Sequence, residues 1–323
     1  MRLMKLASSI VALVLAAGAL GGCAVLLDAR ASSREAAAEA RTPPVGRLID
    51  VGRARIHVHV EGSGPDLVLI HGANGNLRDF TFALSARLAE RYRVIALDRP
   101  GLGWSDVIDG HEDPRAQARA LRAAAEVLEV RNPIVLGHSY GGAVALAWGL
   151  GAPDDTAGLV IVAGASHPWE GGLGLSQTLP ATALGRWAVV PAVTAFASDG
   201  QVEGVLEGIF APQAVPDGYG AHIGTGLSLR RAQIVRNSEQ VSTLKPYLRE
   251  MAPGYGGLEM PIEIVHSDAD TTVGLEIHGR RLAEDAPDAR LTVLEGVGHM
   301  PQHSDPDAII AAIDRAATRA GLR

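Results

Sequence analysis

The chain has 323 residues and a formal net charge of −7. With 47% hydrophobic and 20% charged residues, its composition is that of a globular protein and excludes a disordered, collagen-like or coiled-coil chain. The excess of acidic over basic residues argues against a nucleic-acid backbone as partner. The single cysteine, Cys23, excludes an intrachain disulfide and a cysteine-based zinc or iron–sulfur site.

The N-terminal residues predict export. Arg2 and Lys5 precede an uncharged stretch from Leu6 to Leu27, and a basic segment followed by an apolar one is typical of an export signal. The run from Leu20 through two glycines to Cys23 resembles the lipobox of bacterial lipoproteins, in which the cysteine is lipidated and becomes the new N-terminus. This resemblance implies a signal peptide over 1–22 and a lipid on Cys23.

Two alternatives to the lipoprotein form stay open. One is an uncleaved anchor, since about 20 apolar residues suffice to span a bilayer, and the other is ordinary soluble secretion. All three forms place the rest of the chain outside the cytoplasm. The lipoprotein and the uncleaved anchor also attach it to the membrane of a bacterial cell envelope, on the periplasmic side. Residues 23–44 are rich in Ala, Arg and Glu and end in a Pro pair, which predicts a tether between membrane and domain.

After the tether, the pattern alternates between strands and helices. Arg47–Val51 and Arg55–Glu61 flank a turn at Gly52 and predict a β-hairpin. Six continuous apolar runs then predict parallel strands buried on both faces: Leu67–Ile70, Val94–Leu97, Ile134–Leu136, Leu159–Val162, Ile262–Val265 and Leu291–Leu294. The helical candidates between them are Phe80–Glu90, Pro114–Val130, Gly142–Leu150, Leu275–Ala286 and Pro306–Ala320. The alternation predicts an α/β fold with a mostly parallel, doubly wound sheet.

One stretch, residues 166–257, breaks this rhythm. It contains much Gly and Pro, several short amphipathic segments and no clear strand pattern. Structureless loops of that length are rare, so we predict an inserted helical cap. The core is then formed by residues 45–165 together with 258–323.

The strongest chemical signal is the Gly-x-Ser-x-Gly motif from Gly137 to Gly141, which follows an apolar strand and precedes a helix rich in small residues. In that context the serine, Ser139, occupies a sharp strand-to-helix turn where side chains on the flanking glycines would clash. Its hydroxyl would lie at a helix N-terminus, where backbone N–H groups can stabilise negative charge. We therefore predict that Ser139 is a nucleophile.

With this motif the chain resembles the α/β-hydrolase superfamily, in particular serine hydrolases of the carboxylesterase type with a helical cap. The resemblance implies an acid and a histidine later in the chain. Asp270 stands at the usual position after the strand ending at Val265, with Asp268 as a close rival. His299, in a Gly-His loop after the last strand, would be the general base between Ser139 and Asp270.

The resemblance also implies an oxyanion hole made by two backbone N–H groups. These are the N–H of Ala73, in the loop after the first parallel strand, and that of Tyr140, the residue after the nucleophile. A second loop, from Asp98 to Ser105, matches a family segment that braces the site. In the cap, Trp169, Trp187 and Phe210 are candidates for the substrate pocket, although a helical cap also needs such residues for its own core.

The sequence predicts neither a metal nor a cofactor. His303 lies four residues after His299, but Pro301 breaks the helix that such a metal-binding pair would require. His57 and His59 share one face of the predicted hairpin, and a solvated face explains them. The candidate catalytic residues are therefore the serine, the acid and the histidine alone.

These residues predict a cofactor-free serine hydrolase that cleaves a small-molecule carboxylic ester through an acyl-enzyme. Thioesterases, lactonases, C–C bond hydrolases and cofactor-free haloperoxidases or perhydrolases share the same three residue types and stay open as alternatives. A non-catalytic ligand-binding receptor on the same fold is a further alternative from another class. The sequence does not define the natural substrate or the oligomeric state.

Overall fold

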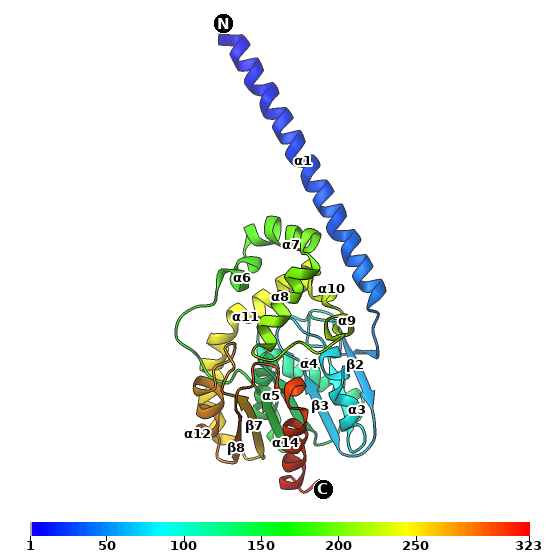
Figure 1. The fold of residues 1–323 in the computed structure, drawn as a ribbon, viewed down its shortest axis with the longest axis vertical. Coiled ribbons are helices and arrows are strands. Elements are labelled where there is room, and N and C mark those ends of the chain that lie inside the picture. The colour runs from blue at the N-terminus through cyan, green and yellow to red at the C-terminus, as the bar shows by residue number, and fades with distance from the viewer. Residues whose placement is uncertain (1) are drawn as a thin grey trace.

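A computed structural model describes residues 2–323, and the side chains of residues 22–323. Its centre is one eight-stranded sheet with the order β1-β2-β4-β3-β5-β6-β7-β8 (Figure 1). The strands are β1 (Arg47–Asp50), β2 (Arg55–Glu61), β3 (Asp66–Ile70), β4 (Arg93–Leu97), β5 (Ile134–His138), β6 (Gly158–Val162), β7 (Ile262–Ser267) and β8 (Ala289–Leu294). Only β2 pairs antiparallel, with β1 and with β4, so the prediction of a mostly parallel α/β sheet is confirmed.

Helices cover both faces of the sheet. One apolar layer joins the sheet to α4 (Pro114–Val127), α5 (Tyr140–Gly151) and α12 (Arg281–Asp285). The opposite layer joins it to α2 (Arg78–Thr81), α3 (Leu84–Leu88) and α14 (Pro306–Arg319). The single helix predicted over Phe80–Glu90 is therefore two short helices, because Ala83 has a non-helical backbone (φ −152°, ψ −37°). The helix predicted over Leu275–Ala286 begins as a π-helical turn, η5 (Glu276–Arg280), before α12.

Between β6 and β7 the chain forms a series of helices above the sheet (Figure 1). We call residues 166–257 the cap. Its elements are α6 (Leu175–Thr178), η2 (Leu179–Ala181), η3 (Gly185–Val189), α7 (Val190–Phe196), α8 (Asp199–Phe210), α9 (Tyr219–Ile223), α10 (Thr225–Ser228), α11 (Arg231–Met251) and η4 (Ala252–Gly257). They lie over the end of the sheet at which β5 leads into α5, and therefore over Ser139.

The N-terminal segment is one long helix, α1 (Arg2–Arg41), which projects beyond the cap (Figure 1). Its last turns pack on α7 and α10, with Ala31 and Ala38 buried. Glu35 pairs with Arg231 at 2.7 Å, and Glu39 pairs with Arg230 at 3.0 Å. The segment predicted as a tether is thus helical and docked as far as Arg41. Alanine has the highest helix propensity and lets helices approach closely, which explains this form.

The side chains of residues 1–21, on which the signal-peptide prediction falls, lie outside the described residues. Among the described residues, no single helix combines the length and the apolar character that a membrane crossing requires. One bent pair, Leu175–Ala181 with Gly185–Phe196, meets the length and composition criteria when its two members are taken together.

Candidate active site

Ser139 lies at the junction of β5 and α5 with φ 54° and ψ −119°, a backbone conformation that non-glycine residues rarely adopt. The glycines of the motif make this turn possible. A Cβ on Gly137 would lie 2.1 Å from the carbonyl oxygen of Gly141, and a Cβ on Gly141 would lie 2.2 Å from that of Ile70. Both positions therefore exclude any side chain, and the strain at Ser139 places its hydroxyl at the start of α5.

The structure brings Ser139, His299 and Asp270 together from three separate loops. Nε2 of His299 lies 3.0 Å from the hydroxyl oxygen of Ser139, and Nδ1 lies 2.7 Å from Oδ2 of Asp270. All three residues are buried. An imidazole held at both nitrogens in this way can accept a proton from the hydroxyl while the carboxylate fixes its orientation.

The two candidate acids occupy different environments. Oδ1 of Asp270 accepts hydrogen bonds from the backbone N–H groups of Thr272 and Val273, at 2.8 and 2.9 Å. Asp268 is exposed, and its side chain accepts a hydrogen bond from the N–H of Gly296 instead. Burial acts to raise the pKa of Asp270, but the hydrogen bond from His299 and those from the backbone outweigh it, so this pKa lies below its usual range. Asp270 therefore faces His299 as a carboxylate.

The loop after β3 lies against the nucleophile. A Cβ on Gly72 would be 3.1 Å from the Cβ of Ser139, which leaves room for backbone alone. Ala73, the next residue, is exposed at this loop, and Tyr140 is the first residue of α5. The backbone N–H groups of Ala73 and Tyr140, the two predicted oxyanion donors, thus come from segments that meet at Ser139.

The profile of the alpha/beta hydrolase family matches residues 67–312. The chain belongs to this family. The match spans β3 to α14 and confirms the resemblance that the serine motif indicated.

Individual relatives of this hydrolase differ in their reactions. The chain is 28% identical to a 2-hydroxy-6-oxo-6-phenylhexa-2,4-dienoate hydrolase of Burkholderia cepacia, over 79% of this chain and 88% of that protein. The solved structure of an esterase from Rhodococcus covers 85% of this chain and 98% of its own, with a TM-score of 0.64 and 23% identity. A bacterial membrane phospholipase A covers 98% and 99%, with a TM-score of 0.65 and 21% identity. At such identities, the two structures establish the fold alone.

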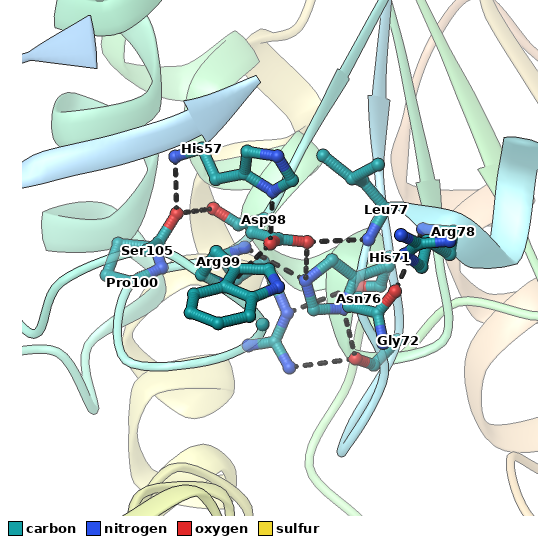
Figure 2. Close-up of polar contacts among 12 residues, drawn as sticks. His57, His71, Gly72, Asn76, Leu77, Arg78, Asp98, Arg99, Pro100 and Ser105 are labelled. Carbon is teal, nitrogen blue, oxygen red and sulfur yellow. Dashed lines mark hydrogen bonds and ion pairs between the residues drawn. The ribbon is translucent and has the colours of Figure 1, made fainter. Parts of the chain in front are cut away.

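Next to the loop after β3, which carries the predicted oxyanion donor Ala73 and which we call the oxyanion loop, this hydrolase buries a polar network around Asp98 (Figure 2). Oδ2 of Asp98 accepts hydrogen bonds from Nδ1 of His57 and from the N–H of Trp104, both at 2.7 Å, and Oδ1 accepts one from the N–H of Leu77 at 2.6 Å. The prediction that His57 lies on a solvated face is therefore wrong. The reason is that β2 is an interior strand, paired with β4, whose end carries Asp98.

Arg99 is the functional candidate that the sequence did not reveal. Its guanidinium is fully buried and donates to four neutral oxygens, those of the His71 and Gly72 carbonyls and of the Gln117 and Gln240 side chains, at 2.8–3.0 Å. It also lies 4.2 Å from the centre of the Tyr140 ring. Burial lowers the pKa of Arg99 to about 10, so the group is still charged at neutral pH.

The position of this charge matters because of peptide geometry. The carbonyl of Gly72 and the N–H of Ala73 belong to the same peptide unit, so the hydrogen bond from Arg99 to that carbonyl polarises the proposed oxyanion donor at its other end. A buried charge held in place before the reaction costs no reorganisation when negative charge develops. We therefore assign Arg99 as a positioning residue for the oxyanion loop.

Replacing Arg99 with methionine should slow the reaction of Ser139 with a fluorophosphonate, whose phosphoryl oxygen occupies an oxyanion hole, by about a hundredfold. Arg99→Lys, which retains a charge but not the planar fork, should recover part of this rate. The measurement is the second-order labelling rate, with thermal unfolding recorded in parallel. Arg122→Met, at a half-buried arginine whose bond to the Gly151 carbonyl lies at the surface, is the control. A folded Arg99→Met protein with an unchanged labelling rate would contradict the assignment.

A second buried cluster links the cap to the loop that carries His299. Asp79 accepts hydrogen bonds from the Tyr219 hydroxyl of α9 and from Nε2 of His303, both at 2.7 Å. The side chain of His303 is therefore bound to Asp79. Burial acts to raise the pKa of Asp79, but the charge of His303 and its hydrogen bond lower it far below the usual range. Through these two contacts, Asp79 of α2 links α9 to the segment that carries His299 and His303.

The three cap aromatics predicted for the pocket have different surroundings. Phe210 is buried and stacks at 5.7 Å between ring centres on His303, beside the histidine loop. Trp169 is half-buried, with its ring 6.2 Å from that of His278. Trp187, on η3, is 76% exposed. That these three aromatics line a substrate pocket stays a prediction.

Proposed function

We propose that this hydrolase cleaves carboxylic esters through a Ser139–His299–Asp270 triad. The observation that carries the proposal is the chain of two hydrogen bonds, 3.0 and 2.7 Å long, that joins the strained serine to the histidine and the histidine to the buried carboxylate. In this mechanism His299 takes the hydroxyl proton as Ser139 attacks the carbonyl, and the Ala73 and Tyr140 N–H groups bind the oxyanion. His299 then protonates the leaving alcohol.

The second half of the reaction releases the acid. Water enters in place of the alcohol, gives its proton to His299 and attacks the acyl group on Ser139. Collapse of the second tetrahedral intermediate breaks the bond to Ser139 and returns the proton to its oxygen. Asp270 stays ionised throughout and stabilises the imidazolium, which agrees with the lowered pKa of its carboxyl group.

The test is direct labelling and turnover. The purified protein should react covalently with a fluorophosphonate, with the label on Ser139, and should hydrolyse p-nitrophenyl esters. A series of increasing acyl chain length would define the acyl group that the cap accepts. A protein that neither labels nor turns over any member of the series would overturn the esterase proposal and favour a non-catalytic receptor.

A second candidate, a C–C bond hydrolase, is favoured by the similarity to the Burkholderia enzyme over 79% of the chain. The same triad serves that reaction, so labelling by a fluorophosphonate does not separate the two. The decay of the visible absorbance of a 2-hydroxy-6-oxo-dienoate does. The comparison includes carboxylic esters, thioesters and lactones. If the dienoate is turned over faster than all of them, the C–C hydrolase proposal replaces the ester proposal.

We also propose that the N-terminus attaches the enzyme to a membrane of the bacterial cell envelope, on the periplasmic side, through a lipid on Cys23. The exposure of Cys23 and the lipobox-like sequence before it support this proposal. Bacteria expressing the protein should incorporate a palmitate analogue into it, and Cys23→Ser should abolish the label. Persistence of the label in Cys23→Ser would contradict lipidation at this residue. Membrane retention of an unlabelled wild-type protein would favour the uncleaved anchor.

A further inference from the structure

Exposed apolar side chains are concentrated in two segments of the described chain, α1 and the stretch from α6 to α7. The described residues include thirteen large hydrophobic side chains that are exposed, and seven of them lie on α1 or on the segment from α6 to α7. Those of the cap segment are Leu175 (78% exposed), Leu184 (62%), Trp187 (76%), Val193 (38%) and Phe196 (60%). We call these five side chains the apolar cap surface. Soluble surfaces rarely gather apolar groups in this way without a binding role.

The sequence around this surface is nearly free of charge. Between Gly171 and Phe196, Arg186 is the single charged residue. The two helical segments within this stretch are bent by 94° relative to one another. The bend places them across the end of the molecule (Figure 1). Apolar helices arranged in that way suit the boundary between headgroups and acyl chains better than a span.

The position of α1 identifies what this surface faces. The guanidinium of Arg30 lies 5.0 Å from the ring centre of Phe196, and it donates to the carbonyl of Ala195 at 2.8 Å. The end of α7 is therefore level with Arg30. The uncharged stretch of α1 ends at Leu27, three residues earlier, which is about 4.5 Å along a helix.

Both forms proposed for the N-terminus put lipid at this level. An uncleaved stretch from Leu6 to Leu27 is about 33 Å long as a helix and matches the hydrocarbon layer. A lipid on Cys23 would enter the bilayer about 10 Å along the helix from Arg30. The two acids at this junction, Asp28 and Glu35, both pair with Arg231, and Arg30 and Arg34 lie between them in the sequence, so positive charge balances them.

We propose that the apolar cap surface rests in the headgroup region of the same bilayer that holds the N-terminus. Trp187 and Phe196 insert their rings at the boundary with the acyl chains, where aromatic side chains are enriched. The cap, and with it the catalytic centre beneath, then takes its substrate from the bilayer surface. This last consequence rests on the proposed ester hydrolysis, whereas the contact itself rests on the proposed membrane attachment alone.

The contact is tested by the fluorescence of the full-length protein in phosphatidylcholine vesicles. Lipids brominated near the headgroup end of the acyl chains should quench part of the tryptophan emission. That part should be lost in Trp187→Phe, because Trp148 is buried and Trp104 and Trp169 are partly covered. Equal fractional quenching of the two proteins would overturn the proposal. Self-association through the same surface, detected by sedimentation of the wild type but not of Trp187→Phe, would assign it to a second copy.

A second measurement tests the consequence for substrate. Leu184→Asp and Phe196→Asp should lower turnover of a vesicle-borne ester on the order of tenfold and leave a soluble ester unaffected. Val127→Asp is the matched control, because Val127 is 60% exposed but precedes β5, at the end of the sheet opposite the cap. Equal losses on both esters, or in the control, would contradict delivery from the bilayer. If no ester is hydrolysed at all, ester cleavage fails while the quenching result still decides the contact.

Discussion

Ser139→Ala is expected to abolish fluorophosphonate labelling and to reduce ester turnover on the order of a millionfold, as loss of the nucleophile does in serine proteases. The physical reason is that the substitution removes the atom that forms the acyl-enzyme, while the oxyanion donors and the binding surfaces remain. The measurement combines steady-state turnover on a p-nitrophenyl ester with mass spectrometry of the labelled protein.

The control for this variant is its fold. Ser139 has a strained backbone, which alanine tolerates no better than serine does, so the unfolding midpoint should change little. A Ser139→Ala protein that keeps a tenth or more of the activity would rule out Ser139 as nucleophile. A protein that loses activity together with its cooperative unfolding transition would instead require Ser139→Cys, which preserves a nucleophilic side chain.

Asp270→Asn should lower turnover on the order of ten-thousandfold, the loss seen when the acid of a serine triad becomes an amide. The amide cannot stabilise the imidazolium, and its NH2 group favours the wrong tautomer of His299. Asp268→Asn should retain nearly full activity, because the exposed Asp268 bonds to the backbone of Gly296 and not to His299. Steady-state rates of the two variants on one ester make the comparison.

The pair of aspartates also provides its own control. Both substitutions exchange oxygen for nitrogen at sites two residues apart, so a general effect of altering this loop would appear in both. Strong inactivation by Asp268→Asn with a mild effect of Asp270→Asn would reassign the acid. The label on Ser139 should also form more slowly in Asp270→Asn, since formation of that adduct depends on the same base.

Local patterns in the sequence predicted those features that local backbone geometry determines. A Cβ on either glycine flanking Ser139 would lie within 2.2 Å of a backbone oxygen, so only glycine fits there. The spacing of these glycines in the sequence therefore predicts the turn. The continuous apolar runs predicted the parallel strands, because a strand covered on both faces has no polar side. Spacing alone did not separate Asp270 from Asp268, since either follows β7 closely enough to reach a histidine on the neighbouring loop.

Features assembled from distant segments were not predictable in this way. Arg99 contacts Gln240, which is 141 residues away, and no periodicity links the two. Two signals were available for Arg99, because it follows the buried strand β4 by two residues and lies in the loop from Asp98 to Ser105 that was predicted to brace the site. His57 was misjudged because the antiparallel pairing of β2 with β4 depends on tertiary structure. The docking of α1 depends likewise on Arg230 and Arg231, which follow it by nearly two hundred residues.

The bond between Tyr219 and Asp79 fixes α9 of the cap to the core. Separating α9 from the core would leave a buried carboxylate without one of its donors, at a cost of about 1–3 kcal/mol. The segment from α6 to α7 is held in a different way. The buried Ser238 of α11 bonds to the backbone of Gln177 and Ala181, and Arg30 and Arg34 of α1 bond to the carbonyl of Ala195. A movement of α1 would therefore be transmitted directly to the end of α7.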